Sequence, residues 1–274
     1  MPLLSDCHLH STFSGDAKDS MEKMILKGID LGLKNMCFTE HMDIDFDYKL
    51  NNLEDGMFEL NTDSYLYELL GLREKYADKM NILFGVEIGV QPHLRRPLAL
   101  YAKEYEFDFI IASTHVIDRY DPYRPEYFNR YANDEEAYRR YFKEIYENLK
   151  VFGNFDVLGH LDYIVRVGKS KDENYSYEAY KDVIDPILEK LIDMEKGLEL
   201  NSGSIPHSLR QMHPATDILK KYRSMGGELI TFGSDAHKTS DIARGLKQAE
   251  EILTECGFKY YATFEKRVPN MHKI

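Results

Sequence analysis

The chain has 274 residues, 43% of them hydrophobic, which is enough apolar material for one large globular domain of the α/β-barrel size. Its formal net charge of −12 argues against docking to nucleic-acid phosphates or to an anionic membrane, whereas a small phosphorylated substrate stays compatible with locally bound cations. No apolar run approaches the roughly 18 residues of a membrane span, and three irregularly spaced cysteines indicate no disulfide framework. With no signal-peptide pattern at its start, the chain is expected to be cytoplasmic.

Short apolar segments of strand length alternate with segments of helical periodicity along the chain. Such alternation is typical of parallel βα units, and seven of them predict a barrel. An open doubly wound sheet is the alternative, weakened because no glycine-rich phosphate loop follows the first strand. The predicted strands are 2–10, 35–41, 81–90, 107–117, 155–165, 197–203 and 228–237, and the predicted helices are 19–33, 63–80, 93–105, 132–151, 176–196, 214–225 and 240–256.

Two prolines and one segment near the end of the sequence add detail to this pattern. Pro214 is expected at the first position of its helix, and Pro186 is expected to kink or split the helix that contains it. The segment 258–266 is a possible short final strand. Because the chain has neither a flexible linker nor a close internal repeat, one domain over 1–274 is expected.

Nearly every predicted strand ends in a histidine or a carboxylate, where a strand buried throughout would carry an apolar residue. In a βα barrel, the carboxyl ends of the strands surround the active site. Residues two apart on a strand point to the same side, so each such pair can bind one ion. More ligands are present than one ion needs, which favours two or three ions sharing a carboxylate. The candidate ligands are His8, His10, Asp16, His41, Glu87, His115, His160, Asp235 and His237.

Each of these residues taken alone has a simpler structural explanation. A single His41 or His160 is more often a hydrogen-bonded structural histidine, Glu87 could be paired with an arginine, and Asp16 could form a turn. Their joint occurrence at consecutive strand ends is what favours a multinuclear metal site.

The motifs "HLHSTFSGD", "TEHMD", "GVEIG", "STH", "GHLD" and "GSDAH" resemble, in order, the signatures of the polymerase and histidinol phosphatase (PHP) superfamily. The resemblance implies an α/β fold, a distorted (β/α)7 TIM-like barrel, with three divalent metal ions at the strand ends. It implies that the first ion is bound by His8, His10, Glu87 and Asp235, the second by Glu87, His115 and His160, and the third by Asp16, His41 and His237.

The form of these motifs is most similar to the histidinol-phosphate phosphatases of that superfamily. The implied reaction is hydrolysis of L-histidinol phosphate to L-histidinol and phosphate, in histidine biosynthesis, by a hydroxide that bridges two metals. Histidine and carboxylate ligands suit zinc, manganese or iron. Asp162 is a candidate proton donor or a partner of a metal-bound histidine. Candidate substrate-binding residues are Arg166, Arg119, Ser202, His207 and Arg210.

Three other functions stay open. A metal-dependent amidohydrolase-like reaction could use a similar barrel, but it would leave no role for a phosphate-binding residue. A PHP phosphoesterase acting on nucleotides or nucleic-acid ends would use the same metal site, although the acidic composition disfavours a nucleic-acid substrate. A catalytically inactive metal-binding domain that regulates a partner is the non-enzymatic alternative, and such a domain would be expected to lose ligands that this chain keeps.

Overall fold

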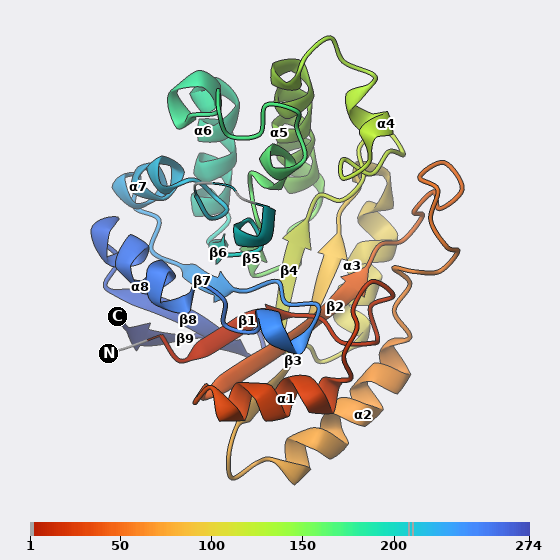
Figure 1. Cartoon of the computed structure of the whole chain (residues 1–274), viewed down its shortest axis with the longest axis vertical. Coiled ribbons are helices and arrows are strands. Elements are labelled where there is room, and N and C mark those ends of the chain that lie inside the picture. The colour runs from red at the N-terminus through yellow and green to blue at the C-terminus, as the bar shows by residue number, and fades with distance from the viewer. Residues whose placement is uncertain (1–2, 208, 210) are drawn as a thin grey trace.

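The computed structural model describes residues 3–207, 209 and 211–274, and its centre is one parallel sheet (Figure 1). The sheet closes on itself, because the amide of Asp235 donates to the carbonyl of His8 and the amide of His10 donates to that of Ala236, each at 2.9 Å. The predicted distorted (β/α)7 barrel is therefore confirmed. The strands follow chain order: β1 (Ser5–Leu9), β2 (Asn35–Met42), β3 (Asn81–Gly89), β4 (Phe109–Ser113), β5 (Val157–Leu158), β6 (Gly197–Asn201) and β7 (Ile230–Gly233).

Helices connect the strands and cover the outside of the barrel (Figure 1). Each buries one apolar stripe; in the first, Met21, Met24 and Ile25 face the core. Among the residues with assigned positions, no helix is long and apolar enough to cross a membrane. The helices are α1 (Met21–Asp30), α2 (Thr62–Lys75), α3 (Arg95–Glu104), the short α4 (Pro125–Phe128), α5 (Asp134–Val151), α6 (Tyr177–Asp193), α7 (Thr216–Ser224) and α8 (Leu246–Glu255), with 3-10 turns at Pro92–Leu94, Tyr163–Arg166, Ile205–His207 and Thr239–Asp241.

The expectation for Pro214 needs correction, and of the two alternatives for Pro186 the structure excludes the split. α7 begins at Thr216, so Pro214 lies before the helix rather than at its first position. α6 is not split, because it continues through Pro186. Buried Ile184 and Ile187 flank that proline, and their packing against the core offsets the hydrogen bond that proline cannot donate.

The possible final strand does form, but outside the barrel. β8 (Tyr260–Glu265) pairs antiparallel with β9 (Val268–Lys273) in a separate hairpin. Phe264 of this hairpin packs against Cys7, Cys37, Leu83 and Phe109, which point into the amino end of the barrel. The hairpin therefore closes this end of the barrel.

Two aspartates that precede strands hold the hairpin in place. Asp108 accepts the amide of Lys266 at 3.0 Å, and Asp156 binds the guanidinium of Arg267 at 2.5 Å. Both aspartates are buried, so these contacts are shielded from water.

Removing the aromatic ring of the hairpin should destabilise the protein. Phe264→Ala leaves a cavity among buried side chains, and we expect the free energy of unfolding to fall by about 3–5 kcal/mol. Urea unfolding followed by circular dichroism measures this change. Tyr67→Ala is the control, because Tyr67 is 84% exposed and its removal should change stability by less than about 0.5 kcal/mol. Equal effects of the two changes would contradict a packed closure.

Candidate active site

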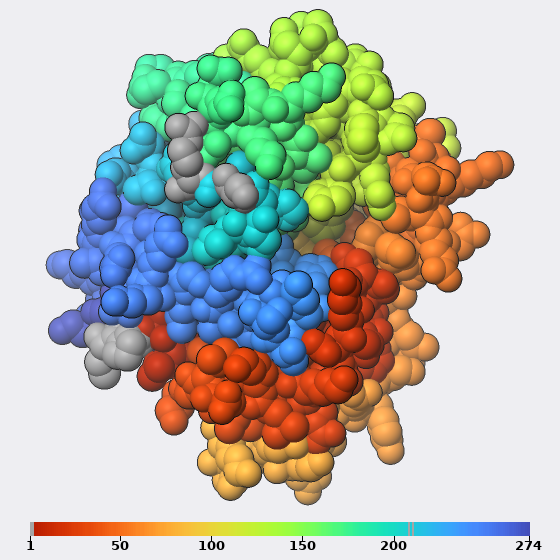
Figure 2. Space-filling view, viewed as in Figure 1, coloured from red at the N-terminus to blue at the C-terminus, as the bar shows by residue number. Residues whose placement is uncertain are grey.

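A cavity of about 400 Å³ lies at the carboxyl ends of the strands, where segments far apart in the sequence meet (Figure 2). Its volume falls in the range of about 300–1,000 Å³ that is typical of small-molecule sites. Three of the predicted ligands, His8, His10 and Glu87, are fully buried at its floor. The other six line the cavity: Asp16, His41, His115, His160, Asp235 and His237.

The first predicted group of ligands is close together. Nε2 of His8 and Nε2 of His10 are 3.1 Å apart. Oδ1 of Asp235 lies 3.7 Å from the former and 3.5 Å from the latter. Asp235 has a left-handed backbone (φ 56°), which turns the chain directly after β7 and directs its carboxylate toward the two imidazoles.

Glu87 connects this first group to the second. Its Oε2 lies 3.4 Å from Nε2 of His8, while its Oε1 lies 2.9 Å from Nε2 of His160 and 3.2 Å from Nε2 of His115. The two oxygens of one carboxylate therefore face two different sets of imidazoles. The pairing of β2 with β3 also places His41 beside Glu87.

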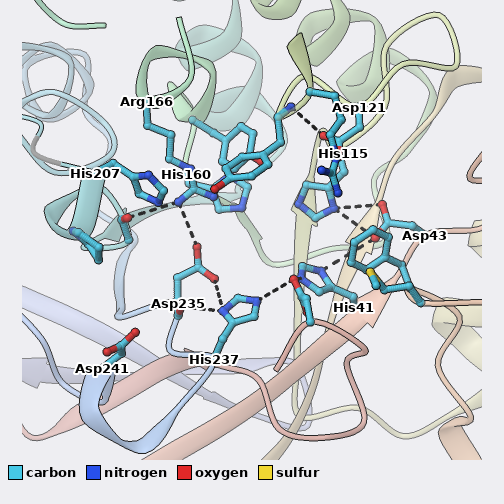
Figure 3. A pocket seen from close by; sticks show the side chains of 18 of the residues that line it. His41, Asp43, His115, Asp121, His160, Arg166, His207, Asp235, His237 and Asp241 are labelled. Atoms are coloured by element: carbon cyan, nitrogen blue, oxygen red, sulfur yellow. Dashed lines mark hydrogen bonds and ion pairs between the residues drawn. The ribbon is translucent and has the colours of Figure 1, made fainter. Parts of the chain in front are cut away.

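The third group is nearer to the mouth of the cavity. Oδ2 of Asp16 lies 3.3 Å from Nε2 of His237 and 3.7 Å from Nε2 of His41. Figure 3 shows His41 and His237 as neighbours in the lining of the cavity, with ring centroids 5.7 Å apart. All nine predicted ligands thus come together in one continuous cluster.

The electrostatics of the cluster favour bound cations. Burial alone would raise the pKa of Glu87, but the imidazoles of His115 and His8 outweigh it and hold this pKa well below its usual range. Burial lowers the pKa of His10, and repulsion from His41 lowers it further. Ionised carboxylates are thus buried with imidazoles that cannot all be protonated together.

Several buried polar atoms in the cluster lack a hydrogen bond. Oε2 of Glu87 and Nδ1 of His41 lie 2.9 Å apart, yet neither makes a hydrogen bond of good geometry within the described part of the chain. A buried polar atom without a partner is costly, and a metal ion would remove this cost. Imidazole nitrogens and carboxylate oxygens are ligands for divalent zinc, manganese or iron. The residues present therefore fit such ions.

Glu199 of β6 orients His8, and this carboxylate was not among the residues predicted from strand ends. Its Oε1 accepts Nδ1–H of His8 at 2.6 Å, which leaves Nε2 of that ring facing the cluster. Its Oε2 accepts the amide of His160 at 2.8 Å. A Cβ on Gly233 would lie 2.2 Å from this carboxylate, so glycine is needed there. The sequence feature that could have indicated this role is a carboxylate inside the otherwise apolar strand segment "GLELNSG".

Asp43 orients the imidazole of His115 directly, and Glu40 orients that of His10 through the hydroxyl of Ser14. Asp43 accepts Nδ1–H of His115 at 3.0 Å. The hydroxyl of Ser14 donates to Glu40 at 2.6 Å and lies 3.1 Å from Nδ1 of His10, so it can accept that ring's proton. Burial raises the pKa of Glu40 to about 7, against the lowering effect of its serine donors. Three buried carboxylates thus set the direction of three predicted ligands.

A family model described as the PHP domain matches residues 6–203. The chain belongs to the PHP family. It is 31% identical to the histidinol-phosphatase of Lactococcus lactis, over 94% of this chain and 93% of that protein. It is 30% identical to a probable histidinol-phosphatase of Clostridium acetobutylicum, over 97% of this chain and 98% of that protein.

A solved structure has the same fold as this PHP domain. It is the histidinol phosphate phosphatase of Lactococcus lactis complexed with zinc, L-histidinol and phosphate, with a TM-score of 0.88 and 29% sequence identity. The match covers 98% of this chain and 99% of that one.

Two of the predicted substrate-binding residues line the cavity of this PHP domain. The guanidinium of Arg166 lies over the ring of Tyr163, 4.0 Å from its centroid, and its Nη1 is 3.7 Å from Oδ2 of Asp235. His207 lies beside Arg166 on the same side of the cavity (Figure 3). Burial lowers the pKa of His207 to about 4, and the charge of Arg166 adds to this effect.

The other candidates lie elsewhere. Arg119 is 77% exposed and pairs with Asp47, outside the cavity lining. The hydroxyl of Ser202 is turned away, donating to the carbonyl of Arg244 at 2.7 Å. Arg210 lies outside the described residues.

Asp162 does not line the cavity. β5 ends at Leu158, so the strand alternation that would have aligned Asp162 with His160 does not extend to these residues. The carboxylate of Asp162 instead binds Nδ1 of His213 at 2.5 Å and accepts the amide of Ala215 at 2.9 Å. Its place in the structure is that of a residue supporting the loop before α7.

Replacing the carboxylate behind His8 should weaken metal binding. In Glu199→Gln the amide can no longer accept strongly from Nδ1–H, so we expect zinc affinity to fall by about 10- to 100-fold, measured by competition with a chromogenic chelator. Glu144→Gln is the control, because Glu144 is also buried but pairs with Arg140 on α5. Unchanged zinc affinity in Glu199→Gln would contradict the orienting role.

Proposed function

We propose that this PHP protein is a phosphoric monoester hydrolase that converts L-histidinol phosphate to L-histidinol and phosphate. The observation that carries the proposal is the convergence of nine imidazole and carboxylate side chains in one cavity. It is supported by similarity, over nearly the full length, to a histidinol phosphate phosphatase whose structure contains zinc, L-histidinol and phosphate.

We further propose that the cluster binds three divalent ions, zinc, manganese or iron. His8, His10 and Asp235 would hold one together with Glu87. Glu87 would share a second with the two imidazoles at its other oxygen. The remaining residues, Asp16, His41 and His237, would hold the third.

When bound, such ions lower the pKa of water to about 7 and offset the negative charge of the phosphoryl group. The chain's own contribution is to hold these ligands in place and to bind the substrate. Arg166 is suited to the phosphoryl oxygens, because its stacking on Tyr163 holds the guanidinium plane and arginine binds phosphate through two parallel hydrogen bonds. The ring of His207 lies beside Arg166, so His207 would contact the same end of the substrate.

Metal content and turnover should be lost together when a ligand is removed. We expect the protein reconstituted with zinc or manganese to release phosphate from L-histidinol phosphate, and His8→Ala to lose at least one metal equivalent with about a 100-fold or greater fall in kcat/KM. Elemental analysis and a phosphate-release assay measure both quantities. Hydrolysis of nucleotide phosphates with no activity on L-histidinol phosphate would overturn the substrate assignment. Full activity in His8→Ala would overturn the metal assignment.

Arg166 should affect binding of the phosphoryl group. In Arg166→Ala we expect the KM for L-histidinol phosphate and the inhibition constant of inorganic phosphate each to rise about tenfold or more. Arg139→Ala is a matched control, because that arginine pairs with Asp182 on the outer helices. Phosphate inhibition that does not change in Arg166→Ala would contradict the assignment.

A further inference from the structure

The aspartates that line the cavity differ in their partners. Asp16 and Asp235 belong to the ligand cluster, and Asp43 accepts from His115. Asp241 forms an ion pair with Arg244. Asp121 is the fifth. It has no place among the proposed ligands, and its charged partner is Arg124, which lines the same cavity and lies 3.7 Å from the carboxylate.

The carboxylate of Asp121 is half satisfied. Its Oδ1 accepts the amide of Tyr123 at 2.7 Å. Its Oδ2 lies 3.7 Å from Nε of Arg124, which is too long for a hydrogen bond. Asp121 is only 8% exposed, and burial raises its pKa to about 6, so at neutral pH it is mostly ionised yet poorly solvated. An ammonium group within hydrogen-bond distance of Oδ2 would relieve this cost more fully than Arg124 does at 3.7 Å.

The loop that carries Asp121 is held in place before any ligand arrives. Its amide donates to Oδ1 of Asn51 at 2.8 Å, and Nδ2 of the same Asn51 donates to the carbonyls of Asp47 and Arg119. Asn51 is itself 1% exposed. The carboxylate therefore has a fixed position, which lowers the entropy cost of binding.

The two ends of the cavity carry different groups, and the end with Asp121 also holds Arg124. Figure 3 shows Arg166 and His207 on one side and Asp121 on the other, near His115 and above the metal-ligand cluster. An anionic group that contacts Arg166 and the cluster would leave the remainder of the molecule to extend toward Asp121. A substrate with a phosphate at one end and an ammonium group at the other matches this arrangement.

We propose that Asp121 binds the ammonium group of the leaving alcohol and so makes the cavity selective for phosphate monoesters of amino alcohols. This inference rests on the proposed phosphatase function and adds the residue that recognises the amine. Asp121 acts through binding and takes no part in breaking the phosphate ester bond.

The test compares substrates that differ only in the amine. We expect the wild-type protein, loaded with zinc or manganese, to prefer L-histidinol phosphate over its des-amino analogue, imidazolylpropyl phosphate, by about tenfold or more in kcat/KM. In Asp121→Asn this preference should fall by about tenfold or more, mainly through a higher KM for the amine substrate. Asp241→Asn, in the same cavity, should keep the preference within about twofold, since that carboxylate pairs with Arg244.

A preference that survives in Asp121→Asn would overturn the proposal, as would equal losses on both substrates, which indicate a merely structural role. A second pair, aminopropyl phosphate and propyl phosphate, separates this inference from the proposed function. If wild-type protein fails on L-histidinol phosphate but prefers aminopropyl phosphate in an Asp121-dependent way, the function is wrong and the amine site stands. If it hydrolyses L-histidinol phosphate and Asp121→Asn keeps the amine preference, the amine site is wrong and the function stands.

Discussion

The sharing of Glu87 between two sets of imidazoles is the interaction on which the site depends. This fully buried carboxylate contacts His8 through one oxygen, and His115 and His160 through the other. An ionised group at such a position is unstable unless positive charge lies next to it. Imidazoles that repel one another supply only part of that charge, so the arrangement is one that favours divalent cations.

The barrel separates the parts that give stability from the parts that carry chemistry. At its amino end, Phe264 and the inward-facing side chains of β1 to β4 form an apolar layer, which the β8–β9 hairpin closes. At its carboxyl end, the strands stop in polar residues and the loops form the cavity. Parallel strands bring all their carboxyl ends to one rim, so a ligand set drawn from the whole chain can meet there.

Buried carboxylates that are not themselves proposed ligands orient two of the imidazoles. Glu199 holds Nδ1 of His8 and Asp43 holds Nδ1 of His115, so Nε2 of each ring faces inward in the neutral form. A ring that is already held in one orientation loses less conformational entropy when a metal ion binds to it. Each carboxylate comes from a different βα unit than its ring: Glu199 lies on β6 and His8 on β1, whereas Asp43 follows β2 and His115 follows β4.

The sequence by itself predicted the alternation of strands and helices, the barrel and the nine side chains that the structure brings together in one cavity. It could do so because periodicity is local and because titratable residues at strand ends depart visibly from the apolar pattern of a buried strand. Only the tertiary structure decided which residues support the site. Glu199 lies inside an apolar run, so its position did not mark it as part of the site. Arg119 and Arg166 both follow predicted strands closely, yet Arg119 is exposed to solvent. Asp162 binds His213 because β5 is shorter than predicted and does not direct this side chain toward the cavity. The predicted final strand likewise lies outside the barrel, in a separate two-stranded hairpin. Each of these outcomes depends on contacts between segments distant in the chain, and periodicity carries no information about such contacts.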